Sequence, residues 1–327
     1  MKANVAIIGS HSFSGNSYAA NILKRENCLT VSRSHKLLPQ FDSRITDGYK
    51  ELKLVWNLNE DSTQVIKAIQ ETGVTTIINF AAQSMVGQSW QSPEDWYEAN
   101  VVSLSKFLNK LRSETSIKKF IQFTTPEVYG STSGWIKENS NFAPNTPYAV
   151  SRAAGDWHLK ALFENFDFPV IFTRAANVYG EHQQLYRIVP KVILSGLTNR
   201  KFPLQGGGKS IRSFIHSADV NSALDKIISG GIIGESYHIS TNELVTIKEL
   251  VQKIALKLNV DFEDLIEITP DRPGKDFAYQ LDSQKIRTEL GWSDEVDLDS
   301  GIERTISWVH RNIDALKNLS TSYIHRR

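Results

Sequence analysis

Four side chains that together could carry out proton transfer lie in the middle of the sequence. Thr125 and Glu127 follow the apolar run 119–124, and Tyr148 and Arg152 come later, one helical turn apart. Residues at i and i+4 lie on one face of a helix, so the Arg152 guanidinium is expected beside the Tyr148 phenol. A nearby positive charge favours the phenolate, which could then act as a base near neutral pH. The pattern predicts an enzyme with a hydroxyl donor, a carboxylate and a tyrosine base.

Short apolar runs alternate with longer segments of helical period in the first half of the chain. Strands are predicted at 5–8, 29–31, 52–56, 75–80, 119–124 and 170–173. Helices are predicted at 16–24, 62–72, 93–112 and 148–165. The strand candidates are continuously apolar, which is typical of a sheet buried on both faces. The alternation predicts an α/β fold built on a doubly wound parallel Rossmann sheet.

The sequence changes character after Ala176, where loops lengthen and helices become isolated. Helices are expected at 217–229, 246–258 and 300–311. Two of them carry capping-box patterns, Thr246 with Glu249 and Ser300 with Glu303. We therefore expect a Rossmann domain at residues 1–176 and a smaller C-terminal α/β substrate domain at 177–327. No clear linker separates them, so residues 210–240 are a candidate to rejoin the first domain.

The first predicted strand runs into a turn that carries two glycines. Gly9 permits a tight turn, and Gly15 permits close packing of the next helix on the sheet. Backbone N–H groups at the start of that helix can hold a pyrophosphate. Ser12 stands where a third glycine is usual, so the turn alone is also compatible with an ordinary strand–helix connection. With the rest of the chain it predicts a dinucleotide site formed by Gly9, Ser12, Phe13, Ser14 and Gly15.

The end of the second strand bears on which dinucleotide binds. An NAD-specific site usually has Asp or Glu there to hold the ribose 2′-OH, whereas this chain has Ser32 and Arg33. Arg33 suits a 2′-phosphate better, although an ordinary surface arginine has the same residue type. We expect NAD or NADP, and these residues favour NADP. Further cofactor contacts are expected from Asn57, Leu58, Phe80, Ala81 and Ala82.

The motifs together resemble the extended short-chain dehydrogenase/reductase family, and most closely its nucleotide-sugar 4,6-dehydratases of the dTDP-glucose 4,6-dehydratase type. The resemblance covers nearly the whole chain and begins with the turn at 9–15. The other matching motifs are Asn-Phe-Ala-Ala (79–82), Thr-Pro-Glu-Val-Tyr-Gly (125–130), Pro-Tyr (147–148), Arg-Ala-Ala-Asn-Val-Tyr-Gly (174–180), Arg-Ser-Phe-Ile-His (212–216), Asp-Arg-Pro-Gly-Lys-Asp (271–276) and Leu-Gly-Trp (290–292).

The resemblance implies a reaction in three steps. Tyr148 removes the proton of the sugar 4-OH while hydride passes from C4 to a tightly held cofactor, and Thr125 hydrogen-bonds the same oxygen. Glu127 then takes the C5 proton as water leaves C6, and the hydride returns to C6. A base, a hydroxyl donor and a carboxylate are the groups that oxidation followed by elimination needs.

Two positions depart from the family pattern. Arg152 replaces the family's Lys, and it keeps the charge but has a bulkier, forked head. Pro126 stands where many relatives have an acidic Asp, and proline cannot donate a proton. Either Glu127 both takes and gives the proton, or water gives it, or the reaction is not a dehydration.

The resemblance also implies a nucleotide-diphosphate sugar as substrate. Arginine is well suited to bidentate contact with phosphate, although each arginine taken alone is more often a surface residue. To the cofactor site the resemblance adds Asn100, Tyr148 and Arg152. The substrate site is expected to contain Gln83, Ser84, Thr125, Asn177, Arg187, Ile188, Pro190, Arg212 and Arg272.

Other interpretations stay open at this point. A 4-epimerase or a nucleotide-hexuronate decarboxylase can share the fold, but a plain epimerase has no use for a base at Glu127. An interpretation of another class is a non-catalytic nucleotide-sugar-binding protein, which Arg152 and Pro126 motivate.

Composition sets the remaining expectations. The 327 residues are 22% charged with a net charge of +1, which gives no sign of a nucleic-acid or membrane surface. A single cysteine, Cys28, excludes an internal disulfide and fits a reducing cytoplasm. The histidines at 11, 182, 216 and 238 have no metal-binding spacing, so we expect no metal. In the family two helices pair across a two-fold axis, and apolar residues on several faces of helices 93–112 and 148–165 support a homodimer: Val101, Leu104, Leu108, Leu159, Leu162 and Phe163.

Overall fold

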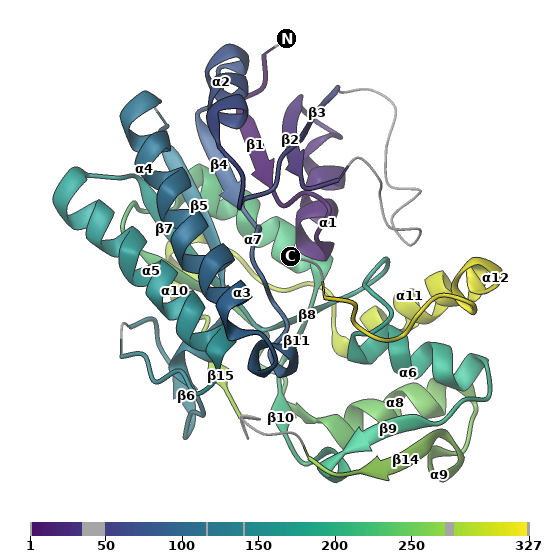
Figure 1. Ribbon diagram of the computed structural model, residues 1–327. Coiled ribbons are helices and arrows are strands. Elements are labelled where there is room, and N and C mark those ends of the chain that lie inside the picture. The colour runs from purple at the N-terminus through teal and green to yellow at the C-terminus, as the bar shows by residue number, and fades with distance from the viewer. Residues whose placement is uncertain (1, 35–49, 116, 140, 272–277, 326–327) are drawn as a thin grey trace.

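A seven-stranded parallel sheet forms the centre of the molecule, in the order β12-β7-β5-β4-β1-β2-β3 (Figure 1). The computed structural model describes residues 2–34, 50–115, 117–139, 141–271 and 278–325. The strands of this sheet are β1 (Val5–Ile8), β2 (Cys28–Ser32), β3 (Glu51–Val55), β4 (Thr76–Asn79), β5 (Lys119–Thr124), β7 (Val170–Ala175) and β12 (Ser236–Ile239). The predicted fold class, a doubly wound parallel α/β sheet, is confirmed.

Helices cover both faces of this sheet, and successive strand residues point to opposite faces. Ile7 and Ile121 enter the core beneath α1 (Phe13–Ile22), α7 (Ser217–Gly230) and α10 (Gln284–Leu290). Ile8 and Phe120 enter the core beneath α2 (Thr63–Thr72), α4 (Leu104–Glu114) and α5 (Pro147–Phe166). Because both faces are buried, the strands are continuously apolar, as their sequences indicated.

The apolar residues used to predict a dimer lie mostly inside this core. Leu104, Leu108, Leu159 and Leu162 are all buried against the sheet. They belong to the wide core faces of α4 and α5, so that part of the argument for a partner subunit was wrong. Other apolar residues of these helices are exposed and are considered below.

A second core lies in the C-terminal half of the chain. It is built by α6 (Ile188–Leu197), α8 (Ile247–Leu258), α11 (Leu298–Arg311), β9 (Phe202–Gln205) and β14 (Ile266–Thr269). Between these elements the chain returns to the main sheet, because β12 pairs with β7 and α7 packs against α1. The Tyr18 hydroxyl of α1 donates to Asp225 of α7 at 2.7 Å. None of the helices in the described part of the chain has the length and apolar content needed to cross a bilayer.

Short elements complete the connections. They are β6 (Trp135–Ile136), β8 (Asn177–Tyr179), β10 (Ile211–Arg212), β11 (Phe214–His216), β13 (Val245–Thr246), β15 (Gln280–Leu281), α9 (Phe262–Leu265), α12 (Ile313–Leu316) and the 3₁₀ turns η2 (Gly87–Trp90), η4 (Pro126–Tyr129) and η5 (Gly206–Gly208).

The helix predicted at 93–112 is not one regular helix. It consists of α3 (Pro93–Tyr97), a π-helical segment η3 (Glu98–Ser103) and then α4. A π turn widens the hydrogen-bond register, and such turns often occur at functional sites. Here the segment carries Asn100, whose backbone oxygen lies so close to Gly155 of α5 that a Cβ there would be 2.7 Å from it. The two helices are therefore in close backbone contact at Asn100 and Gly155.

The starts of two C-terminal helices test the predicted capping boxes. The box at the start of α8 is confirmed: Thr246 Oγ1 accepts from Glu249 N at 3.1 Å, and Glu249 accepts from Thr246 N at 2.7 Å. The box at Ser300 is wrong, because α11 begins earlier, with Asp297 as its N-cap. Asp297 accepts from Ser300 N at 2.8 Å, which places Ser300 inside the first turn.

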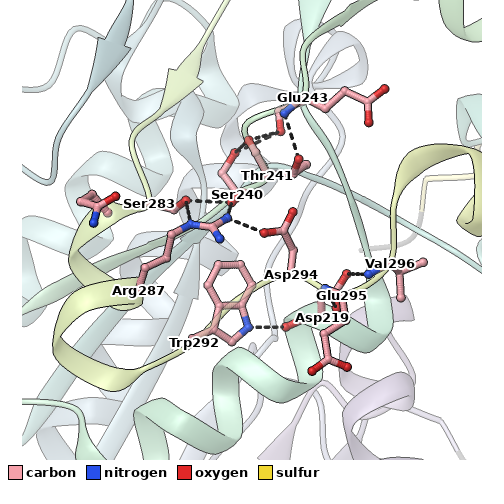
Figure 2. A network of polar contacts seen from close by, with 12 residues as sticks. Asp219, Ser240, Thr241, Glu243, Ser283, Arg287, Trp292, Asp294, Glu295 and Val296 are labelled. Carbon is pink, nitrogen blue, oxygen red and sulfur yellow. Dashed lines mark hydrogen bonds and ion pairs between the residues drawn. The ribbon is translucent and has the colours of Figure 1, made fainter.

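A polar network joins the loop after β12 to the segment that leads into α11 (Figure 2). Arg287 donates to the Ser240 carbonyl at 3.1 Å and pairs with Asp294 at 2.5 Å. Asp219 of α7 accepts from Glu295 N and Val296 N, and its own carbonyl accepts from Trp292 Nε1. The network fixes where the chain leaves the main sheet for the second core.

Candidate active site

The segments singled out by the sequence all follow strands of the main sheet. Gly9 follows β1, Arg33 follows β2, Phe80 follows β4 and Thr125 follows β5. Because these strands are parallel, their carboxyl ends meet at one edge. The strand order reverses at β1, whose neighbours β2 and β4 lead to opposite sides of the sheet. Ligands of open α/β sheets bind in the crevice beside such a switch point.

The turn after β1 has the shape that a dinucleotide requires. Gly9 has a φ of +80°, and a Cβ there would lie 2.6 Å from the backbone N of Ala81. A Cβ on Gly15 would collide with the backbone oxygen of Gly9, so helix and turn can meet only at glycine. Ser12 replaces the third glycine and caps α1, since its Oγ accepts from Gly15 N at 3.1 Å. Phe13 is buried and Ser14 is half-buried beside this cradle.

The end of β2 presents one charged side chain to the surroundings. Ser32 is buried, and its hydroxyl donates to the Ser34 carbonyl at 2.9 Å. Arg33 is exposed. After β3, Asn57 Oδ1 accepts from Asn59 N at 3.2 Å, and Leu58 packs against the core below. The surface at the ends of β2 and β3 is therefore formed by Ser32, Asn57 and Leu58. The exposed Arg33 lies beside them.

The loop after β4 is tied to the neighbouring helices. Asn100 Oδ1 accepts from Gln83 N at 2.9 Å, and its Nδ2 donates to Gln83 O and to Ser151 Oγ. Asn100 thus joins the loop to η3 and α5, a positioning role that the sequence did not indicate. Phe80 is buried against Phe123, with ring centroids 4.9 Å apart. The remaining predicted residues of this loop are half-buried or exposed: Ala81, Ala82 and Ser84.

Thr125, Glu127, Tyr148 and Arg152 converge where β5 meets the start of α5. Thr125 follows the strand and caps η4, accepting from Glu127 N at 3.3 Å. Thr146 caps α5, so Tyr148 lies in its first turn, where its backbone N–H donates to Ser89 Oγ at 3.2 Å. Tyr148 hydrogen-bonds Thr125 through its side chain and lies in the electrostatic field of Arg152 and Glu127. The structure therefore brings the four predicted catalytic residues together.

Burial and the charge of Arg152 act in opposite directions on the protonation of Tyr148. Burial raises the pKa of the phenol above its ordinary value, and Arg152 opposes this by favouring the phenolate. Glu127 raises the pKa again, whereas the Thr125 hydrogen bond and Arg187 lower it. Arg152 thus lowers the phenol pKa, as its spacing predicted, but burial raises the pKa more strongly because the phenolate would lose its hydration. Arg152 is 5% exposed and also donates to the Phe123 carbonyl at 2.5 Å.

The predicted substrate residues fall into two groups. Arg187 immediately precedes α6 and its charge lowers the pKa of Tyr148, and Ile188 and Pro190 lie in the first turn of that helix. Asn177 and Arg212 meet elsewhere, at Tyr279: the Tyr279 hydroxyl donates to Asn177 at 2.7 Å, and the Arg212 guanidinium lies 4.4 Å from the ring centroid. The predicted contact Arg272 lies outside the described residues.

A buried ion pair between β7 and α5 holds the end of β5 in place. Arg174 and Asp156, 2% and 3% exposed, pair at 2.8 Å. Thr124 donates to the same Asp156 oxygen at 3.0 Å, so the residue before Thr125 is fixed to the helix that carries Tyr148. The sequence motifs did not indicate this structural role of Asp156. Its place two helical turns after Tyr148, on the same face, is the signal that could have indicated it.

The described residues contain no group of three or more His, Cys, Asp or Glu side chains arranged as a metal site. The glycine cradle and the tyrosine base instead define the class, a dinucleotide-binding enzyme of the short-chain dehydrogenase/reductase type.

Comparison with known proteins places the chain within this class. The family described as GDP-mannose 4,6 dehydratase matches residues 8–305. The mouse dTDP-D-glucose 4,6-dehydratase is 34% identical over 251 residues, which cover 75% of this chain and 70% of that protein. The Streptomyces niveus dTDP-glucose 4,6-dehydratase is 34% identical over 241 residues, covering 73% and 71%. The chain therefore belongs to the extended short-chain dehydrogenase/reductase family, among its nucleotide-sugar 4,6-dehydratases, as predicted.

Solved structures agree over almost the full length. A double mutant of dTDP-glucose 4,6-dehydratase from Streptomyces venezuelae, with NAD and DAU bound, superposes with a TM-score of 0.87 at 26% identity and covers 96% of this chain and 98% of that one. The dTDP-glucose 4,6-dehydratase from Bacillus anthracis, in complex with NAD, gives 0.86 at 27% identity, covering 95% and 97%.

Proposed function

We propose that this chain converts a nucleotide-diphosphate hexose into its 4-keto-6-deoxy derivative by removing water across C5 and C6. The observation that supports this most strongly is the gathering of Thr125, Glu127 and Tyr148 at the carboxyl end of β5, next to the glycine cradle. The cradle at Gly9 and Gly15 fits NAD or NADP, whose nicotinamide accepts hydride from C4 and returns it to C6. Because the electrons return to the sugar, the reaction needs no outside oxidant.

The chain's own residues would move the protons. Tyr148 takes the proton of the 4-OH, and Thr125 holds the same oxygen through the hydroxyl that already contacts Tyr148. The 4-ketone acidifies C5–H, and the half-buried Glu127 takes that proton. Pro126 is buried and has no proton to give, so we propose that Glu127 passes the same proton to the departing 6-OH and returns to its carboxylate form. When hydride then adds to C6, C5 takes a replacement proton from exchangeable groups, and Tyr148 releases the proton of the 4-OH to solvent.

The substrate would lie between the two cores. We propose a Rossmann unit that consists of residues 1–176 together with α7 and β12. The rest of 177–327 would form a nucleotide-sugar unit. Arg187, Arg212 and Asn177 would hold the nucleotide diphosphate, with Arg272 as a further contact. Arginine supports this role because its forked head matches phosphate oxygens.

A panel of nucleotide sugars with mass detection tests the proposal. The purified protein, supplied with NAD and NADP, should release a product lighter by one water from at least one nucleotide hexose. An isomer of unchanged mass would indicate an epimerase, and loss of carbon dioxide from a hexuronate would indicate a decarboxylase. Binding of nucleotide sugars without any turnover would support the non-catalytic interpretation.

The cofactor choice rests on Arg33. We propose that NADP is preferred, because Arg33 extends from the end of β2 where a carboxylate would hold a free 2′-OH. Arg33→Ala should weaken NADP binding about 10- to 100-fold and leave NAD binding nearly unchanged, since charge-assisted hydrogen bonds to a phosphate are lost. Titration of both dinucleotides by calorimetry measures this. Equal losses for NAD and NADP would remove the argument for NADP.

The quaternary structure is also a proposal. Exposed apolar side chains remain on α5 and on the α3–η3 helix: Val150, Trp157, Tyr97 and Val102. Val150 and Trp157 lie seven residues apart on one helical face, and Trp157 is 45% exposed. We propose that this face pairs with a second copy across a two-fold axis. Light scattering at micromolar concentration should give a dimer, and Trp157→Glu should shift it towards monomer. A monomeric mass for the parent would contradict the dimer.

A further inference from the structure

The chain after α12 leaves the second core and returns to the main sheet. In Figure 1 the yellow trace runs back from α12 towards the centre of the molecule. Leu319 still packs against the second core, whereas His325 contacts α3, which follows β4. We call residues 319–325 the strap.

One end of the strap is anchored by a specific contact. The His325 Nε2–H donates to the Asp95 carboxylate at 2.8 Å, and both side chains are largely covered, 26% and 14% exposed. The imidazole also stacks on the fully buried Trp96, with ring centroids 5.0 Å apart and planes within 10°. A hydrogen bond and a ring stack on adjacent residues fix both the position and the orientation of His325.

The middle of the strap contacts the segment that leads into α6. The Tyr323 ring meets Tyr186 edge to face at a centroid distance of 5.3 Å, next to Arg187 at the start of α6. Burial raises the pKa of Tyr323, Tyr186 raises it further, and Arg33 and Arg187 oppose these effects. The charges of Arg33 and Arg187 therefore both act on the phenol of Tyr323.

These contacts place the strap over the carboxyl edge of the sheet. It touches α3 on the β4 side and the start of α6 on the substrate side, and it lies in the field of Arg33 on the β2 side. The strap thus runs from the segment before α6 to the helix that follows β4, on the side of the sheet where the glycine cradle follows β1. A dinucleotide held in the cradle would therefore lie beneath the strap.

We propose that the strap slows release of the bound dinucleotide. Tyr323 would lie over the dinucleotide, and His325 would hold the strap in place through its contacts with α3. This rests on the proposed function, which makes the reaction redox-neutral. A dehydrogenase must exchange its cofactor in every cycle, but here the hydride returns to the sugar, so the cofactor has no need to leave. A cover that slows dinucleotide release therefore costs nothing in turnover, and it keeps the cofactor in place while the sugar is oxidised.

The experiment measures dinucleotide release from the purified, loaded protein, with an excess of a dinucleotide-consuming enzyme as a trap. The variants are Tyr323→Ala, His325→Ala and a chain ended after Ser320. His325→Gln, which keeps a donor for Asp95, should recover part of the loss. Ile324→Ala is the matched control, because that side chain belongs to the strap but is 63% exposed. We expect release to be about tenfold faster or more in the first three variants, and unchanged in the control.

Two results would overturn the proposal. Release rates within about twofold of the parent in all three variants would show that the strap does not retain the cofactor. Tighter retention after shortening would show that the segment competes with the dinucleotide. Failure of the proposed function is recognised separately: a parent protein that holds a dinucleotide but removes no water from any nucleotide hexose would contradict the proposed function and still allow the release rates to be compared.

Discussion

Glu127→Gln should stop the elimination and leave the first oxidation in place. Glutamine keeps the size of the side chain but cannot take the C5 proton, so product formation should fall by roughly 10²- to 10⁴-fold. Because C4 oxidation precedes that step, reduced nicotinamide should build up in this variant when substrate is added. Absorbance spectra and mass analysis of the sugar measure the two steps separately.

The control for this prediction is Glu267→Gln, which removes an exposed carboxylate of β14, remote in sequence from Glu127 and Tyr148. It should retain parental turnover. Unchanged product formation in Glu127→Gln would show that another group takes the C5 proton, and the proposed proton path through Glu127 would then be wrong.

Tyr148→Phe should abolish the first oxidation, with a loss of about 10³-fold or more, because phenylalanine lacks the hydroxyl that takes the 4-OH proton. No reduced nicotinamide should accumulate in this variant, even when it is combined with Glu127→Gln. The fold should survive, because phenylalanine keeps the buried ring. Circular dichroism and dinucleotide binding check this. Substantial reduced nicotinamide in the double variant would contradict the role of Tyr148.

Arg152 should act on the same step through the pKa of Tyr148. Its charge lowers a pKa that burial has raised, so Arg152→Met should raise the pKa further. Activity that depends on the phenolate increases with pH, so the rising limb of the pH–rate profile should move to higher pH. Arg152→Lys should keep much of the activity, because the charge remains. Identical profiles for the parent and Arg152→Met would show that the cation does not tune Tyr148.

The regular parts of this fold were predictable from local sequence. The bounds of β1 and β5 agree with the prediction because their apolar runs end abruptly at Gly9 and Thr125. The π segment at Asn100 was not predictable, since hydrophobic periodicity does not specify a widened hydrogen-bond register. The start of α11 was misplaced because Asp297 and Ser300 are both good caps, and only tertiary packing selects between them.

The candidate site was predictable where its residues belong to motifs. Thr125, Glu127 and Tyr148 were found that way, and the structure brings them together. The protonation of Tyr148 was not predictable, because charge spacing is visible in sequence whereas the extent of burial is not. Tyr323 and His325 gave no signal at all, since the residues they contact are distant in sequence and match no motif.

The most direct test of the dehydratase mechanism is turnover in heavy water. The product should have lost one water, and it should carry a single solvent deuteron at C5, because the proton taken there is replaced from exchangeable groups. Mass spectrometry gives the water loss, and proton NMR gives the position of the deuteron. A product that keeps its original C5 hydrogen, or one formed without loss of water, would contradict the proposed function.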